Sequence, residues 1–296
     1  MNDLYFKVAD NYFRIKNNDE NDIRQLIPSY APFHVAKPDH ADCMFTMQVG
    51  TGLVGNQPEG EEIGHFDGGD AKHDVYRLAD GGYYIFIRDY KDNATCALRT
   101  TADFSQCETS LFGDNNCQSY GLNNALMIAF AFAGAHHNIL LMHASVIMNQ
   151  GYGYLFLGKS GTGKSTHSQL WLKHIEGSDL LNDDNPAVRV DFGQNTVTVY
   201  GSPWSGKTPC YRNLQVPVGA FLRLQQYPEN IIRKEPGVKA FATILSSCST
   251  MIWDKPSYDA ICDTVAKIAG LVPAFHLKCL PDQAAAELSY SHLSRH

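Results

Sequence analysis

The sequence predicts an α/β protein in two parts: a smaller β-rich N-terminal part, then a part in which strands and helices alternate around a mixed sheet. Short apolar runs broken by turn residues fill the first part up to about residue 112. Beyond residue 120, apolar strands alternate with segments of helical period. Turn residues at 113–116 separate the two patterns, so we expect domains at 1–117 and 118–296.

The composition of the 296 residues excludes several classes of partner. The formal net charge is −7 and no basic run is present, which argues against a nucleic-acid binder but leaves anionic substrates open. The longest apolar run, 125–135, is shorter than the roughly 18 to 20 residues that span a bilayer. With no secretory signal at the start and no Cys-x-x-Cys pair, we expect a cytoplasmic protein with reduced thiols and no membrane partner. A homo-oligomer is compatible with the sequence.

Residue patterns in the first part predict individual strands and a hairpin. Strands are predicted at 43–49, 83–88 and 95–100. The last two are separated by a Lys-Asp-Asn turn, which indicates a hairpin. The Ala-rich apolar segment 120–136 then predicts a buried helix at the start of the second domain.

In the second part, predicted strands and helices alternate up to the end of the sequence. Strands are expected at 139–148, 152–157, 188–191, 196–200, 216–224 and 274–277, and helices at 164–175, 237–248, 257–270 and after Pro281. The pair 188–191 and 196–200 flanks Gly-Gln-Asn and indicates another hairpin. The strand order is therefore expected to be mixed rather than purely parallel.

A phosphate-loop motif, Gly-x-x-x-x-Gly-Lys-Ser, occupies residues 158–165. It follows the apolar strand 152–157 and opens a helix with an apolar face, which is the context that phosphate binding requires. Loop amides would surround a phosphate, the lysine would reach the outer phosphates, and the following hydroxyl would contact Mg²⁺. The predicted nucleotide-binding residues are Gly158, Lys159, Ser160, Gly161, Thr162, Gly163, Lys164, Ser165 and Thr166.

A second match to the same pattern, 201–208, lacks this context. Pro203 removes an amide from the would-be loop, and no helical period follows Thr208. Two interpretations of this segment stay open, a surface loop and a loop that lines a substrate site. In the second, Trp204, Lys207 and Arg212 would contact an anionic substrate or product phosphate.

A third glycine pattern, Gly-Thr-Gly-Leu-Val-Gly at 50–55, matches a dinucleotide fingerprint with Asp70 downstream. The segment that follows it, Asn-Gln-Pro-Glu-Gly, cannot open a helix. We therefore interpret it as a turn.

An acidic pair, Asp183 and Asp184, ends a short apolar strand shortly after the phosphate-loop motif. One carboxylate could hold hydrated Mg²⁺ while the other accepts a proton from an attacking hydroxyl. The alternative is a solvated Asp-Asn-Pro turn. Upstream, His143 stands on the strand before the loop strand, where a lone histidine is usually a satisfied core residue.

As an ordered set, Met142-His143-Ala-Ser, the glycine motif and Leu181-Asn-Asp183-Asp184 resemble the HPr kinase/phosphorylase family. They are also similar to the related ATP-dependent phosphoenolpyruvate carboxykinases. The resemblance covers about residues 139–225 and implies an atypical P-loop kinase domain that uses ATP and Mg²⁺. It implies that Lys164 and Ser165 contact the phosphates and the metal. It also implies that Asp183 and Asp184 supply the base and a metal contact. His143 would lie at the reaction centre.

The leading hypothesis is therefore a kinase that transfers the γ-phosphoryl group of ATP to a hydroxyl, either a serine of a peptide or protein or the hydroxyl of a small molecule. A nucleotide-gated regulatory protein without turnover is the alternative. Carboxykinase activity is a third and less favoured possibility.

Overall fold

The chain forms two compact units, Met1–His137 and Asn138–His296. The computed structural model describes residues 3–18, 22–39, 42–53, 60–68, 71–206 and 208–294. The division falls later than the predicted 117/118 boundary, because helix α1 (Asn115–Ala135) packs on strands of the first unit rather than the second. Within the described ranges, no helix is both long and apolar enough to cross a membrane.

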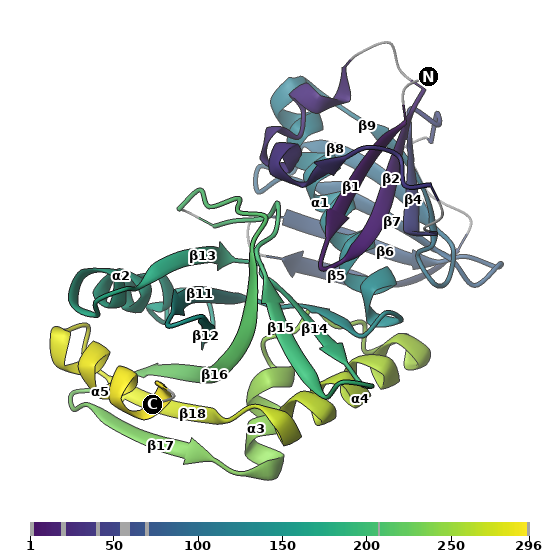
Figure 1. Ribbon diagram of the computed structural model, residues 1–296. Helices are drawn as coiled ribbons and strands as arrows, with labels where there is room; N and C mark the ends of the chain where they lie inside the picture. The colour runs from purple at the N-terminus through teal and green to yellow at the C-terminus, as the bar shows by residue number, and fades with distance from the viewer. Residues whose placement is uncertain are drawn as a thin grey trace. The chain divides into compact units, whose positions relative to one another are not determined.

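The first unit is a mixed nine-stranded sheet in the order β3-β1-β2-β4-β9-β8-β7-β6-β5 (Figure 1). Its strands are β1 (Leu4–Val8), β2 (Asn11–Asn17), β3 (His34–Val35), β4 (Cys43–Val49), β5 (Glu61–Gly68), β6 (Ala71–Arg77), β7 (Tyr83–Arg88), β8 (Ala94–Thr100) and β9 (Gln106–Leu111), with 3₁₀ turns at Ile23–Gln25 and Pro28–Phe33. The predicted hairpin is confirmed as β7 and β8, with Tyr83 opposite Thr100.

Helix α1 covers part of this sheet and begins at a capped turn. The Asp114 side chain accepts hydrogen bonds from the backbone N–H groups of Asn116 and Cys117, which satisfies two of the free donors at the helix start. Gly121 lets the helix approach closely, because a Cβ there would lie 2.5 Å from the Thr95 carbonyl oxygen. The helix is therefore held against β8 by backbone proximity as well as by its apolar face.

The second unit contains a mixed nine-stranded sheet with four helices. Its strands are β10 (Ile139–Leu141), β11 (Ala144–Asn149), β12 (Tyr152–Leu157), β13 (Asp179–Asp184), β14 (Ala187–Asp191), β15 (Thr196–Tyr200), β16 (Gln215–Gln226), β17 (Ile231–Glu235) and β18 (Ala274–Cys279). Its helices are α2 (Lys164–His174), α3 (Gly237–Leu245), α4 (Lys255–Leu271) and α5 (Gln283–Leu293). The strand order is β10-β14-β15-β16-β12-β11-β13, with β18 beside β16 and β17 beside β18. Strand β16 is parallel to β12 and β18 but antiparallel to β15, so the mixed order is confirmed.

One predicted strand is interrupted where the site forms. The expected strand 139–148 divides into β10 and β11 at Met142 and His143. The Met142 N–H donates to the Pro186 carbonyl at 3.1 Å, and the His143 N–H donates to the Ser247 carbonyl at 2.7 Å. Backbone partners outside the ladder therefore take His143 out of the strand. Strand β17 was also not predicted.

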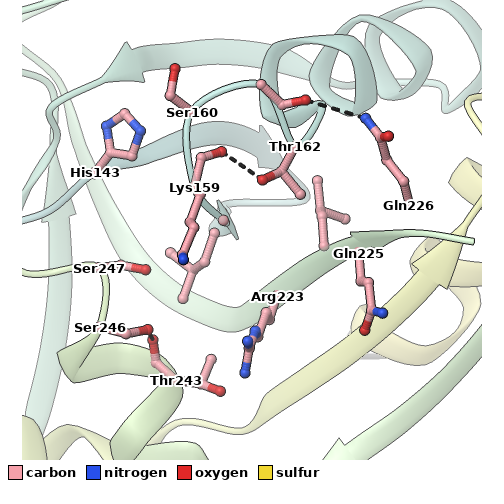
Figure 2. Close-up of a pocket in the computed structure, with 14 residues that line it drawn as sticks. His143, Lys159, Ser160, Thr162, Arg223, Gln225, Gln226, Thr243, Ser246 and Ser247 are labelled. Atoms are coloured by element: carbon pink, nitrogen blue, oxygen red, sulfur yellow. Dashed lines mark hydrogen bonds between the residues drawn. The ribbon is translucent and has the colours of Figure 1, made fainter. Parts of the chain in front are cut away.

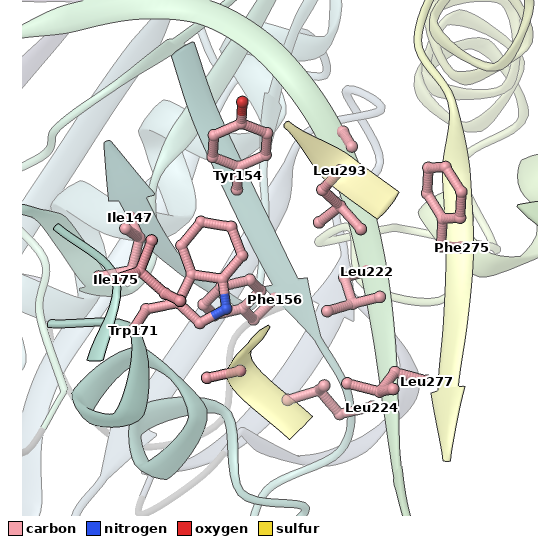
Figure 3. Packing of buried hydrophobic residues seen from close by; sticks show 12 residues of the cluster. Ile147, Tyr154, Phe156, Trp171, Ile175, Leu222, Leu224, Phe275, Leu277 and Leu293 are labelled. Atoms are coloured by element: carbon pink, nitrogen blue, oxygen red, sulfur yellow. The ribbon is translucent and has the colours of Figure 1, made fainter. Parts of the chain in front are cut away.

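One apolar core cluster of the second unit lies between the sheet and helices α2 and α5 (Figure 3). Trp171 of α2 is fully buried, with its ring centroid 5.3 Å from Tyr154 and 5.4 Å from Phe156, both on β12. Trp171 Nε1 donates to Ser289 Oγ on α5 at 2.9 Å. This packing fixes the direction of α2, and hence the position of the loop that precedes it.

A buried histidine in this core is expected to make the stability depend on pH. Ser289 Oγ donates to the Ala286 carbonyl, so it accepts from His167 Nε2, 3.0 Å away, and His167 is neutral. Burial lowers the pKa of His167 to about 4. An unfolded chain takes up this proton near pH 6.5 and the folded chain only near pH 4. The free energy of unfolding is therefore highest above pH 6.5, as far as His167 determines it, and it falls between pH 6.5 and 4 by up to about 3 kcal/mol.

Unfolding by urea at a series of pH values tests this expectation. The variant His167→Gln keeps an N–H donor for Ser289 but does not titrate, so its loss of stability over the same pH range should be smaller. Equal losses in the two proteins would contradict the assignment.

Candidate functional site

The glycine loop (residues 158–163) joins β12 to α2 in a conformation that its glycines permit. Gly158, Gly161 and Gly163 have φ values of 153°, 79° and 107°, which side chains other than glycine rarely adopt. The loop is closed by Thr162, whose N–H and Oγ1 donate to the Lys159 carbonyl at 3.1 and 2.6 Å (Figure 2). Ser160 and Gly161 are exposed on the loop, and Thr166 is exposed on the first turn of α2.

Helix α2 starts directly from this loop, with Gly163 at its N-cap. Glycine has no side chain to cap the first backbone N–H groups, so these donors and the positive end of the helix dipole are available to an anion. A ligand that bears phosphate groups would satisfy them. The loop and helix thus have the local structure that the sequence predicted.

Lys164, His143 and Asp184 form a chain of contacts at the start of α2. Lys164 Nζ lies 2.7 Å from His143 Nε2 and donates to the Gly158 carbonyl at 3.0 Å. His143 Nδ1 lies 2.8 Å from Asp184 Oδ1. A protonated lysine can only donate, so Nε2 accepts and the Nδ1 proton faces the carboxylate. The three residues, from three separate segments, are therefore coupled through one imidazole.

Lys164 is nearly buried, with 9% of its surface exposed. Burial lowers the pKa of Lys164, while the charges of Asp184 and Asp183 oppose the shift. The ammonium is thus poorly solvated and held close to two carboxylates. An added anion at this point would gain a strong charge-assisted contact.

Ser165 and Asp183 form a second pair beside this chain. Ser165 Oγ donates to Asp183 Oδ1 at 2.9 Å, and Asp183 is only 3% exposed. Its other oxygen, Oδ2, is buried, and no described residue donates to it. A buried carboxylate oxygen without a donor is unfavourable. The oxygens of Asp183 and Ser165 are hard ligands of the kind that Mg²⁺ prefers, so these residues fit a Mg²⁺ site completed by phosphate oxygens and water.

Asp184 has an unusual backbone conformation. Its φ is 134°, in the region that favours glycine, and such strain costs about 1 to 3 kcal/mol. The segment 201–206 helps to hold it, because Ser205 forms a bridge with Asp184 and the Ser205 hydroxyl donates to the Asp183 carbonyl at 3.1 Å. The Gly206 N–H donates to the same carbonyl. Strain maintained by several neighbours is common at functional sites.

Asn182 also holds the acidic pair in place and was not singled out in the sequence. It is fully buried, its Nδ2 donates to the Trp204 carbonyl at 2.9 Å, and its Oδ1 accepts from the Asn185 N–H at 3.0 Å. The only signal for it was a polar residue within a short apolar strand. Its amide ties the segment 201–206 to the end of β13.

The structure brings five predicted residues together and separates others from them. The group comprises His143, Lys164, Ser165, Asp183 and Asp184. Trp204 is buried with 2% exposure and contributes its backbone carbonyl to Asn182 and Ser202. Arg212 donates to the Asp179 carboxylate and the Leu180 carbonyl, both at 2.6 Å, at the opposite end of β13 from the acidic pair. Lys207 lies outside the described residues, as do Gly55 and Asp70 of the third glycine pattern.

A pocket of about 680 Å³ lies beside the glycine loop. Its walls come from the loop, from the end of β16 and from the end of α3 (Figure 2). The lining residues are His143, Leu157, Gly158, Lys159, Ser160, Gly161, Thr162, Arg223, Leu224, Gln225, Gln226, Thr243, Ser246 and Ser247. Gln226 Nε2 donates to the Gly161 carbonyl at 3.2 Å and so connects β16 to the loop. His143 belongs both to this pocket and to the contact chain, so the pocket opens onto the site.

Comparisons with known proteins find a distant structural similarity. No protein-family model matches the chain, and no curated protein matches it. Among solved structures, it is similar to the HPr(Ser) kinase/phosphatase from Coxiella burnetii, with 15% sequence identity and a TM-score of 0.30. The match covers 51% of this chain and 95% of that one.

Proposed function

We propose that this protein is an ATP- and Mg²⁺-dependent kinase of the HPr kinase-like type, which transfers the γ-phosphoryl group of ATP to a hydroxyl. The observation that carries the proposal is the contact chain from Lys164 through His143 to Asp184, at the end of a glycine loop that opens a helix. It joins a phosphate-binding cation to a carboxylate that can accept a proton. The Ser165–Asp183 pair stands beside it.

The loop amides, the first N–H groups of α2 and Lys164 would bind the phosphates of the nucleotide. Ser165 and Asp183 would hold Mg²⁺, which neutralises charge on the phosphates when it is bound. Asp183 suits this role because one of its oxygens already faces Ser165 while the other is buried without a described donor. The metal contact therefore falls to Asp183 more naturally than to Asp184.

Asp184 would then act as the base. The acceptor oxygen forms a bond to the γ-phosphorus, the bond from that phosphorus to the β–γ bridging oxygen breaks, and the acceptor proton passes to the Asp184 carboxylate. His143 holds one Asp184 oxygen through Nδ1 and so orients the carboxylate. In this arrangement His143 contacts Lys164 on one side and the base on the other, and it links phosphate binding to the position of the base.

Labelling with [γ-³²P]ATP tests the proposed activity. The purified protein is incubated with Mg²⁺ and either a protein fraction or a small-molecule fraction of a cell extract, with Lys164→Ala as the control. We expect a labelled, acid-stable phosphoester in one fraction with the parent and none with the variant. Tight ATP binding by the parent without any transfer in either fraction would contradict the kinase and favour a nucleotide-gated regulatory protein.

A further inference from the structure

The pocket beside the glycine loop carries two cationic side chains that lie outside the contact chain of Lys164, His143 and Asp184. Lys159 points into it from the loop, and Arg223 lies on β16 across from the loop (Figure 2). Both are exposed, and among the described residues neither side chain has a hydrogen bond or an ion pair. The described lining contains no aspartate or glutamate. In a chain of net charge −7, this pocket is a local concentration of positive charge.

The surroundings of Arg223 strengthen this charge. Arg223 is in register with His276 on β18, and His276 with Arg233 on β17, so the three lie in one row on the same face of the sheet. The carboxylate of Glu235, two residues along β17 from Arg233, accepts a hydrogen bond from Thr243 Oγ1 at 2.5 Å, and among the described residues it forms no ion pair with Arg223. Arg223 is therefore left to bind an anion from outside the chain.

Hydroxyl groups that line the pocket at the end of α3 can donate further hydrogen bonds to an anion bound by Lys159 and Arg223. Ser246 and Ser247 line the pocket at the end of α3, and the Ser247 carbonyl accepts the His143 N–H at 2.7 Å. An anion between Lys159 and Arg223 would thus lie in the cavity that His143 also lines. It would not need the N–H groups at the start of α2 or the Lys164 ammonium, which the nucleotide phosphates would occupy in the proposed function.

We infer that this pocket binds an anionic group, a carboxylate or a phosphate, of a small hydroxyl-bearing acceptor, through Lys159 and Arg223. The inference rests on the proposed function and narrows its acceptor from any hydroxyl to an anionic small molecule. The volume of about 680 Å³ lies within the range of about 300 to 1,000 Å³ that small-molecule sites occupy. Binding of the anionic group here would place the acceptor's hydroxyl toward His143 and Asp184.

Thermal unfolding tests the subsite with simple anions as probes. The glycine loop is first saturated with Mg²⁺ and AMP-PNP, a non-hydrolysable ATP analogue, and inorganic phosphate or malonate is then added at constant ionic strength. A ligand of the folded state raises Tm by mass action. We expect phosphate, malonate or both to raise Tm, and the choice between them identifies the class of anion. Arg223→Gln and Lys159→Gln should each weaken the anion's apparent affinity about tenfold or more.

The controls separate this inference from the proposed function. Lys239→Gln removes an exposed cation of α3 that does not line the pocket, and it should leave the anion response unchanged. If neither anion raises Tm in the loaded protein, or if Arg223→Gln weakens AMP-PNP binding instead, the subsite is overturned while the kinase stands. If AMP-PNP itself fails to bind the parent, the proposed function is overturned, and the anion titration without nucleotide still reports on Arg223.

Discussion

Replacing Lys164 with alanine is expected to lower the affinity for ATP by about 100-fold or more. The Lys164 ammonium is nearly buried, and its present partners are His143 Nε2 and the Gly158 carbonyl. A phosphate would add a charge-assisted hydrogen bond to a poorly solvated cation, and such bonds contribute about 1.5 to 3 kcal/mol. Loss of the cation also leaves the charges of Asp183 and Asp184 unbalanced near the nucleotide phosphates. The two effects act in the same direction.

Equilibrium binding of a fluorescent ATP analogue, with unlabelled ATP as competitor, measures this change. The matched control is Lys173→Ala, which removes an exposed lysine from the last turn of the same helix. It should bind ATP like the parent. If Lys164→Ala also binds ATP as tightly as the parent, the glycine loop is not the phosphate site, and the central proposal is wrong.

Much of the second unit could be predicted because its elements depend on local sequence. The strand 152–157, the glycine loop and the following helix are specified by an apolar run, by glycines and by the Lys-Ser start of the helix. The hairpin of β14 and β15 follows in the same way from alternating apolar residues around a turn. The acidic pair was expected near the loop because it ends a strand shortly after the motif, whereas the place of His143 beside them was expected only from the resemblance to a family.

The features that could not be predicted depend on contacts between distant segments. His143 leaves its strand because Ser247, about a hundred residues later, accepts its N–H. Likewise, helix α1 could not be assigned to the first unit from its own composition, since its Ala-rich surface would suit either sheet. The φ of Asp184 is held with help from the segment 201–206, for which the sequence left open a surface loop or a loop lining a substrate site and did not indicate a backbone support.

The two carboxylates are expected to respond differently to substitution, and the backbone at Asp184 allows a further test. Asp184→Asn and Asp184→Gly should each reduce the rate of phosphoryl transfer by about 10² to 10⁴, the usual contribution of a general base. Glycine also relieves the strain of φ 134°, which offsets the flexibility that it adds to the unfolded chain. We therefore expect Asp184→Gly to be more stable to urea than Asp184→Asn, by about 1 kcal/mol. A less stable glycine variant would contradict the strain at this residue.

Asp183→Asn should instead change the dependence on Mg²⁺. The amide oxygen can still accept from Ser165, so the fold of the site is kept, but the negative charge that would hold the metal is lost. We expect the Mg²⁺ concentration for half-maximal transfer to rise about tenfold or more in Asp183→Asn and to stay near the parent value in Asp184→Asn. Both variants are measured by varying Mg²⁺ at a fixed concentration of free ATP. If Asp184→Asn shifts the Mg²⁺ requirement and Asp183→Asn does not, the two roles are exchanged, because the metal would then depend on the carboxylate that His143 contacts.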